Sequence, residues 1–233
     1  MGKRIIQQRR GRGTLTYRVR RNAFKYKIKY PASIGKAKVV KLLNSAGHSA
    51  PLAKIKVNDE VFYNPAAKGL FEGQEIELGS KLSEGNILQL KDIPTGRRVF
   101  NIERSPGDGG KIMRASGSYG VITKKAEKVT ILLPNRKELL FLGHCRATVG
   151  EIAGSGRVKK PIIKAGKQYY IKKAKSKLWP RTSAVKMNAI DHPFGSGRGK
   201  RIKSKIAKRN APPGANVGHL RPRRTGRRKG KRR

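Results

Sequence analysis

The chain has 233 residues, of which 57 are Lys or Arg and 13 are Asp or Glu, for a formal net charge of +44. Its single cysteine, Cys145, excludes an internal disulfide and a cysteine-based zinc site. No stretch approaches the ~18 apolar residues of a membrane span, and the first ten residues lack the apolar run of a secretory signal. We therefore expect a soluble intracellular protein.

The basic residues concentrate at the two ends of the chain. Residues 1–30 hold eleven basic residues and no acidic residue, and residues 173–233 hold 21 basic residues and one acidic residue. Residues 31–172, in contrast, hold 25 basic and twelve acidic residues. Such ends repel themselves, so we expect them to order only against a dense polyanion. Nucleic acid is favoured, because neutralised phosphates release counterions. A membrane surface is the rival, but neither end shows a basic helix with an apolar face.

The middle of the chain predicts short β-strands separated by turn residues. Apolar and polar residues alternate in part, and Gly, Asn, Asp and Pro interrupt the pattern at short intervals. Residues 65–69 predict one helical turn that Gly69 ends, and residues 134–136 predict a hairpin turn. Cys145 is predicted to be a buried strand thiol. The predicted strands are residues 38–43, 52–57, 74–78, 86–90, 99–103, 119–123, 129–133, 138–142 and 146–152.

Nine short strands favour two small barrels, although a single sandwich remains the alternative. We place the boundary between the barrels near residues 93–96, where turn residues interrupt the strands. Residues 193–231 are rich in Gly, Pro, Arg and Lys, which is the composition of a basic low-complexity segment and not of one that forms a core.

A glycine-rich loop at residues 189–201 carries the candidate chemistry of the C-terminal end. Its glycines let the backbone approach a phosphate while Arg198 and Lys200 supply charge, but it lacks the ending of a P-loop. His192 is either a general base beside Asp191 or a loop histidine that binds RNA or caps a turn. The second interpretation is favoured, because sequence neighbours seldom form the required imidazole–carboxylate bond and no nucleophile pattern accompanies them.

A second loop, at residues 105–119, has similar chemistry. Lys111 and Arg114 can reach phosphates, and Ser116 can donate a hydrogen bond. Asp108 either orders a turn or holds a hydrated magnesium ion shared with phosphate. A plain solvated hairpin is the alternative for the whole loop.

Aromatic residues also lie among cations, at residues 169–170 and 179–181. Base stacking on single-stranded RNA uses this combination, and burial against a barrel is the alternative.

Several short motifs follow one another along the chain in an order that is typical of one protein family. They are QRRGRGT at 8–14, SPGDGGK at 105–111, RASG at 114–117, CRATVG at 145–150, MNAIDHPFG at 187–195, RNAPPG at 209–214 and RTGR at 224–227. The chain resembles, over nearly its whole length, the family of universal large-subunit ribosomal protein number two in its archaeal form.

The resemblance implies a mainly β protein with an OB-like barrel followed by an SH3-like barrel and long basic, largely irregular extensions. On this basis we divide the chain into an N-terminal extension (1–33), an OB-like barrel (34–93), an SH3-like barrel (94–172) and a Gly/Pro-rich C-terminal extension (173–233). The resemblance also implies a structural, non-enzymatic protein that is a primary rRNA-binding protein of the large subunit. It would stabilise rRNA near the peptidyl-transferase region and support subunit association, tRNA binding and peptide-bond formation.

The implied partners are large-subunit rRNA, small-subunit rRNA at the subunit interface and neighbouring ribosomal proteins, on cytoplasmic ribosomes and without a membrane. No cofactor is expected beyond magnesium shared with rRNA phosphates. His192 matches a family histidine near the peptidyl-transferase region and is taken as a positioning residue. An architectural protein that coats DNA is the rival binding function. The expected rRNA contacts are Arg9, Arg10, Arg12, Lys111, Arg114, Ser116, Arg146, Arg181, Asn188, His192, Arg198, Lys200, Arg223 and Arg224.

Overall fold

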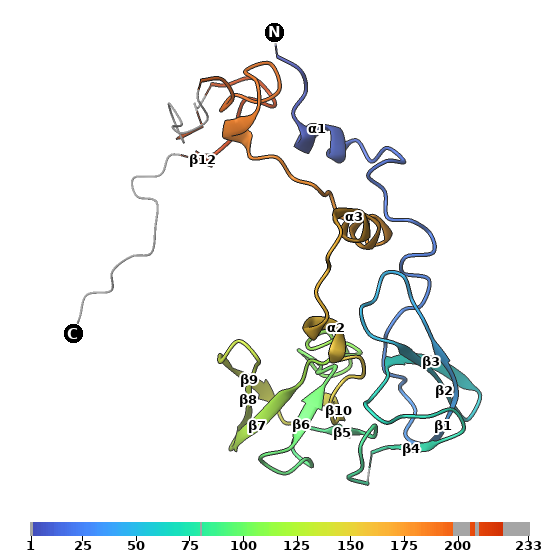
Figure 1. Cartoon of the computed structure of the whole chain (residues 1–233). Helices are drawn as coiled ribbons and strands as arrows, with labels where there is room; N and C mark the ends of the chain where they lie inside the picture. Colours follow the sequence, from blue (N-terminus) through green and yellow to red (C-terminus); the bar gives the residue numbers. More distant parts are fainter. Residues whose placement is uncertain (1, 80, 198–205, 208–209, 221–233) are drawn as a thin grey trace, which may run out of the picture. The chain divides into compact units, whose positions relative to one another are not determined.

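The computed structural model describes residues 2–79, 81–197, 206–207 and 210–220 (Figure 1). The chain forms two compact units, one of residues 19–175 and the other of residues 1–18 and 176–233. Each unit is considered by itself below. Within the described ranges, no helix has the length and apolar character needed to cross a membrane.

The first group of strands in the 19–175 unit is an antiparallel set in the order β3-β2-β1-β4. Its inward side chains form one core cluster, in which Val39, Ile55 and Val57 are buried, because these positions point to the same face of their strands. A register shift between Val39 and Lys41 marks a bulge in β1. The strands are β1 (Gly35–Leu43), β2 (Leu52–Val57), β3 (Glu60–Pro65) and β4 (Glu75–Leu78).

The second group runs in the order β5-β10-β6-β7-β8-β9 and has a core cluster of its own, which includes Ile122, Ile131 and Phe141. Cys145 is buried in this cluster directly before β10, which confirms that its thiol is buried. Residues 134–136 join β8 to β9 as the expected hairpin turn. The strands are β5 (Ile87–Gln89), β6 (Arg98–Phe100), β7 (Gly120–Lys125), β8 (Lys128–Leu132), β9 (Glu138–Leu142) and β10 (Arg146–Val149).

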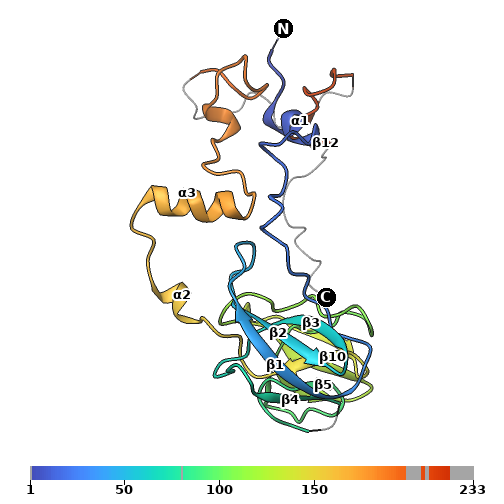
Figure 2. The same cartoon turned by 90° about the vertical axis from the view of Figure 1, so that its right-hand side faces the viewer.

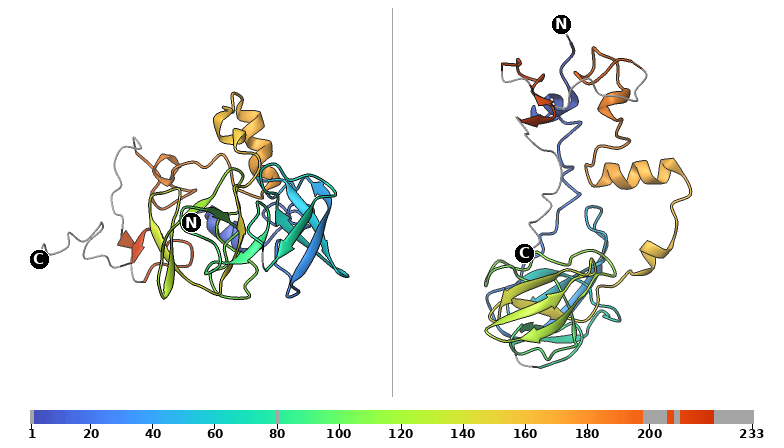
Figure 3. Two further views of the ribbon diagram at one scale, coloured as in Figure 1. Left: turned by 90° about the horizontal axis from the view of Figure 1, so that it is seen from below. Right: turned by 90° about the vertical axis from the view of Figure 1, so that its left-hand side faces the viewer.

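The two groups meet where β4 pairs with β5 in parallel through Leu78 and Ile87. Figure 1 and the left-hand view of Figure 3 show β1–β4 in blue to teal and β6–β9 in green as separate groups. Figure 2 is seen from the side of β1–β4, and β10 pairs with β5 and β6. The fold class is therefore as predicted: a mainly β protein with an OB-like and an SH3-like barrel and basic extensions. The boundary between residues 93 and 94 stays a prediction.

Each of the nine predicted strands overlaps an observed strand, but β3 was not predicted. The helical turn expected at residues 65–69 was wrong. Pro65 ends β3, and the amide of Leu70 donates to the carbonyl of Ala67 (3.2 Å) in a β-turn. Gly69 has a φ of +83°, so a glycine does end this turn, although the turn is not helical. Two unpredicted helices follow β10, α2 (Gly156–Lys159) and α3 (Ala165–Ala174), and neither has a buried residue.

The described residues of the other unit contain little regular structure. It has the short helix α1 (Ile6–Gly11), a 3-10 turn η1 (Ala184–Lys186) and a parallel pair of two-residue strands, β11 (Ile206–Ala207) and β12 (His219–Leu220). Among its described side chains only Ile5 and His192 are buried. For the residues that the structure describes, this confirms extensions that are largely irregular.

Candidate nucleic-acid interface

Positive charge without a matching number of acids is the main property of the unit formed by residues 1–18 and 176–233. The sequence places six basic residues in the first segment and nineteen in the second, against one acid, Asp191. That acid lies 3.9 Å from the ammonium of Lys3. The sequence of the unit offers its remaining cations no other acidic side chain, so a phosphate-rich partner would supply the missing negative charge.

The three predicted arginines of the N-terminal end lie around α1. Arg9 and Arg10 occupy its last turn and Arg12 follows it, and all three side chains are exposed. Basic residues at a helix C-terminus complement the partial negative charge of its carbonyl groups. The local structure therefore presents these guanidinium groups outward, where phosphates can reach them.

A compact series of turns builds the loop around His192. The amides of Asp191 and His192 donate to the carbonyl of Asn188, and the amide of Ser196 donates to the carbonyl of Met187 (3.1 Å). A Cβ at Gly195 would lie 2.2 Å from the Asn188 carbonyl oxygen, so this turn requires glycine. Asn188 itself is exposed, as is expected of a side chain that binds RNA.

The imidazole of His192 is buried and has a defined hydrogen bond. Its Nδ1 accepts the backbone N–H of Phe194 (3.0 Å), and its ring meets the Phe194 ring edge to face. Because Nδ1 is an acceptor, the neutral ring carries its proton on Nε2. Burial lowers the pKa of His192 below its usual value, which favours this neutral form. Asp191 pairs with Lys3, and no bond joins it to the imidazole.

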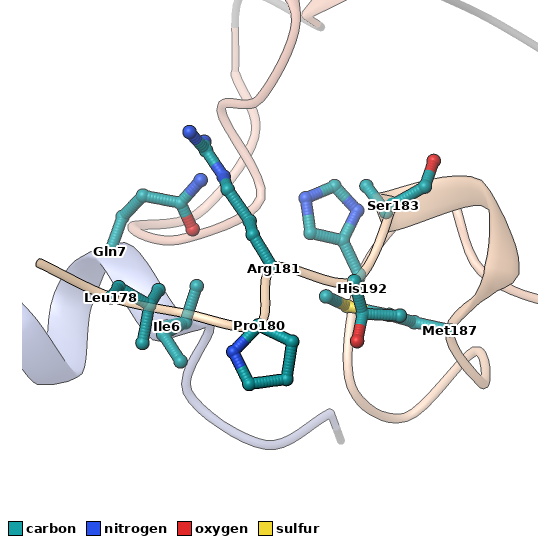
Figure 4. A pocket seen from close by; sticks show the side chains of 10 residues that line it. Ile6, Gln7, Leu178, Pro180, Arg181, Ser183, Met187 and His192 are labelled. Carbon is teal, nitrogen blue, oxygen red and sulfur yellow. The ribbon is translucent and has the colours of Figure 1, made fainter. Parts of the chain in front are cut away.

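Two cavities adjoin this histidine within the unit. Each has a volume of about 400 Å³, and Gln7, Ala184 and His192 line both. The side chain of the predicted contact Arg181 lines the first, where Figure 4 shows it rising between Gln7 and His192, with Ile6, Leu178 and Pro180 below. The structure therefore brings Arg181 and His192 together, 11 residues apart in the chain.

In the 19–175 unit, Arg146 is held by the fully buried carboxylate of Glu103. Oε1 accepts from Nη2 (3.1 Å) and Nε (3.3 Å) of Arg146, and Oε2 accepts from its backbone amide (2.8 Å). Nη1 of Arg146 donates to the carbonyl of Pro31 (2.6 Å). The guanidinium also lies over the Tyr30 ring. This arginine therefore fixes the segment of Tyr30 and Pro31 to the start of β10.

Arg114 is anchored nearby by a second set of acceptors. Its Nε donates to Oδ1 of Asn101 (2.9 Å), and its Nη2 donates to the carbonyls of Ile28 (3.3 Å) and Gly109 (3.5 Å). Its Nη1 makes no hydrogen bond within the described residues. The phenol of Tyr30 contacts Asn101 as well, donating to its carbonyl (2.7 Å), and burial raises the pKa of Tyr30 well above its usual value.

Asp108 orders the turn of the loop at residues 105–119. Its Oδ1 accepts the amide of Gly110, and its Oδ2 accepts the amides of Arg104 and Ser105. Burial opposes ionisation, but these amides, together with Lys111, lower the pKa of Asp108 below its usual value. The ammonium of Lys111 lies 3.6 Å from Oδ2 and is mostly exposed, so it can also reach a phosphate.

The carboxylate of Asp108 is a poor fit to a directly bound metal ion, because three amides and a cation already occupy its oxygens. Among the described residues there is no cluster of three or more His, Cys, Asp or Glu that could hold a metal. Magnesium shared with RNA phosphates stays a prediction.

Comparison with known proteins decides the family. Residues 83–214 match the family described as "Ribosomal Proteins L2, C-terminal domain". The chain is 44% identical to "Large ribosomal subunit protein uL2" of Archaeoglobus fulgidus, over 97% of this chain and 99% of that protein. It is 45% identical to the protein of that name from Methanothermobacter thermautotrophicus, over 98% and 100%. The chain belongs to the uL2 family.

For this uL2 family member, some of the expected contacts point inward. Ser116 is buried, and its Oγ accepts a hydrogen bond from Nε of Arg157 (2.7 Å), while its amide donates to Ser49. Arg157 was missed by the sequence analysis, because nothing in its immediate sequence distinguishes it from other exposed cations. Gln7 and Met187, which line the cavity beside His192, were likewise missed. Arg198, Lys200, Arg223 and Arg224 lie outside the described residues.

Proposed function

We propose that this uL2 family chain is a structural, non-enzymatic constituent of the large ribosomal subunit that binds rRNA. The observation that carries the proposal is the similarity, over nearly the full length of both chains, to proteins named as large-subunit proteins. The charge distribution supports it. A unit with 25 basic residues and one acid requires a dense polyanion, and rRNA is the polyanion of a ribosome.

The exposed cations and the anchored ones have different parts in this proposal. Arg9, Arg10, Arg12, Lys111 and Arg181 are exposed and would neutralise phosphates directly. Arg114 and Arg146 hold the protein together through the hydrogen bonds described above. Their remaining N–H groups would donate to rRNA. Asn188 and His192 would contribute hydrogen bonds, and the undescribed Arg198, Lys200, Arg223 and Arg224 would contribute charge. The buried Ser116 would act indirectly, by holding the exposed Arg157 through its Oγ.

Folded RNA shape, and not linear sequence, would select the binding site. Phosphate contacts carry no base information, and the β barrels provide rigid surfaces that fit only RNA segments already brought together. The division into residues 1–33, 34–93, 94–172 and 173–233 is part of this proposal: the two barrels set the position, and the two extensions lower phosphate repulsion where rRNA segments converge.

Membership of the uL2 family supports a more specific proposal. We propose that the chain stabilises rRNA near the peptidyl-transferase region of cytoplasmic ribosomes, with His192 as a positioning residue, and supports subunit association, tRNA binding and peptide-bond formation. Its partners would be large-subunit rRNA, small-subunit rRNA at the interface and neighbouring ribosomal proteins. The hydrogen bond from the Phe194 amide to Nδ1 supports positioning, since it fixes the ring with Nε2–H as a donor.

Equilibrium binding at matched salt tests the proposal against the DNA-coating alternative. Folded large-subunit rRNA and duplex DNA of equal length would be titrated with the full chain at several salt concentrations. The proposal predicts clear discrimination in favour of rRNA that persists as salt rises, because shape complementarity is not screened. Equal affinity for both nucleic acids at every salt concentration would contradict it.

A further inference from the structure

The cavity beside His192 that Arg181 lines is larger than a phosphate group needs. We propose that it binds an unpaired nucleobase of RNA, with the Arg181 guanidinium on the adjoining phosphate. This inference rests on the proposed RNA-binding function and adds a specific pocket to it. The cavity, of about 400 Å³, falls within the ~300–1,000 Å³ typical of small-ligand sites.

The walls of the cavity are apolar on one side. Ile6 from α1 and Leu178 and Pro180 from the C-terminal segment lie together, and Met187 lines the cavity close to His192 (Figure 4). Such surfaces accept the face of a nucleobase, because every base has an apolar π-face that stacks on flat or polarisable side chains. The imidazole of His192 adds an aromatic wall.

The polar groups are those that a base edge requires. Because Nδ1 of His192 accepts the Phe194 amide, its Nε2–H remains as a donor. The Gln7 amide offers both a donor and an acceptor, and the Ser183 hydroxyl can be either. Unpaired bases in RNA are bound by aromatic stacking together with hydrogen bonds to their edges.

The charge of the site selects an anionic ligand. No acidic residue lines the cavity, and Arg181 is exposed where it can meet a phosphate. The nearest acid in sequence, Asp191, lies beside Lys3. An acidic peptide would satisfy Arg181 but would leave the apolar wall and the base-edge groups without partners, so a nucleotide unit of RNA fits the whole set.

Methyl NMR of the full chain gives a direct test, because the chain has only three methionines and one of them lines the cavity. With ¹³C-labelled methionine methyls, adenosine 5′-monophosphate should shift the Met187 resonance saturably and leave Met113, in the other unit, unchanged. Ribose 5-phosphate at the same concentrations supplies the phosphate without the base and should leave Met187 unchanged. An equal Met187 shift with both probes, or none with the nucleotide, would overturn the proposal.

A matched pair of substitutions separates the cavity from general effects on the loop. Ala184→Leu places a larger side chain in the cavity wall, whereas Ala189→Leu makes the same change at an exposed position outside it. The first should abolish the nucleotide-induced Met187 shift and the second should preserve it. If Ala184→Leu disturbs the unit without ligand, Gln7→Leu tests the same point by removing a base-edge partner from an exposed residue. Retention of the wild-type shift in both Ala184→Leu and Gln7→Leu would contradict the site.

A final comparison extends the test to an RNA chain. A single-stranded RNA pentamer should bind the full chain about tenfold more tightly than the same pentamer with an abasic central residue, as expected for one stacked base. Ala184→Leu should remove this difference. If the difference is absent in the wild-type chain while folded rRNA still binds, the pocket proposal fails alone. If folded rRNA does not bind either, the proposed function fails with it.

Discussion

Arg146 and Glu103 form an ion pair in which the carboxylate is fully buried and accepts three hydrogen bonds from the arginine, two from its guanidinium and one from its backbone amide. The same guanidinium holds the carbonyl of Pro31. A single arginine thus connects the start of β10 to the backbone at Pro31.

Replacing this arginine should destabilise the fold strongly. Arg146→Ala leaves the Glu103 carboxylate buried without its cation, so we expect the free energy of unfolding to fall by about 3–5 kcal/mol. Urea denaturation of the full chain measures this. Lys56→Ala, which removes an exposed ion pair with Asp59, is the control and should cost less than about 1 kcal/mol.

Adding Glu103→Gln to Arg146→Ala should recover part of the lost stability, because the buried group is then neutral. An Arg146→Ala chain as stable as the Lys56→Ala control would contradict a structural role for Arg146. Contact with rRNA would then be the only role left for it.

The loop at Asp108 should lose stability in acid. A carboxylate whose folded pKa is lowered stabilises the fold fully above its unfolded pKa of about 3.9 and loses that contribution as the pH falls through the lower folded pKa. Asp108→Asn cannot ionise. Its deficit in unfolding free energy should therefore be constant near neutral pH and shrink as the pH falls below about 4. A deficit that is independent of pH down to pH 2 would contradict the lowered pKa.

Gly195→Ala should disrupt the His192 loop, since the new Cβ would lie 2.2 Å from the Asn188 carbonyl oxygen. We expect the Met187 methyl resonance to shift or broaden, because the hydrogen bond from the Ser196 amide to the Met187 carbonyl closes the same loop. Gly166→Ala in α3, where a Cβ meets nothing within 4 Å, is the matched control and should leave Met187 unchanged. Identical Met187 spectra for both variants would show that the loop tolerates a side chain at residue 195.

Removing residues 221–233 should weaken the salt dependence of rRNA binding. This segment contains nine basic residues, and each phosphate contact contributes about 0.7–0.9 to the slope of log affinity against log salt concentration. The magnitude of that slope should therefore fall by several units in the shortened chain. Filter binding over a salt series measures it, and an unchanged slope would show that these residues contact no phosphate.

The strand pattern was predictable where apolar and polar residues alternate, as in β2 and β4. The strand β3 was missed because Glu60, Asn64 and Pro65 have low strand propensity; they are tolerated because β3 is the last strand in the sheet order. Helix α3 was missed for another reason. Its sequence has no apolar stripe of helical period, and in the structure none of its residues is buried.

The sequence predicted which residue types form the candidate site, but it did not predict which of their side chains point into the protein. Glycine, lysine and arginine patterns pointed to the loops at residues 105–119 and 189–201. The partners that turn Arg146, Arg114 and Ser116 inward are distant in sequence: Glu103 is 43 residues from Arg146, and Ile28 is 86 from Arg114. No local pattern records such pairings, and the cavity beside His192 likewise depends on α1 meeting a segment near the other end of the chain.

Sedimentation of a tagged copy of the chain tests the central claim most directly. Cell extract would be washed at high salt and separated on a sucrose gradient, with Arg146→Ala as a destabilised comparison. If the chain is a structural constituent of the large subunit, the tagged wild type should remain with large subunits after the wash. Its release into the soluble fraction, or its recovery with DNA, would contradict the account.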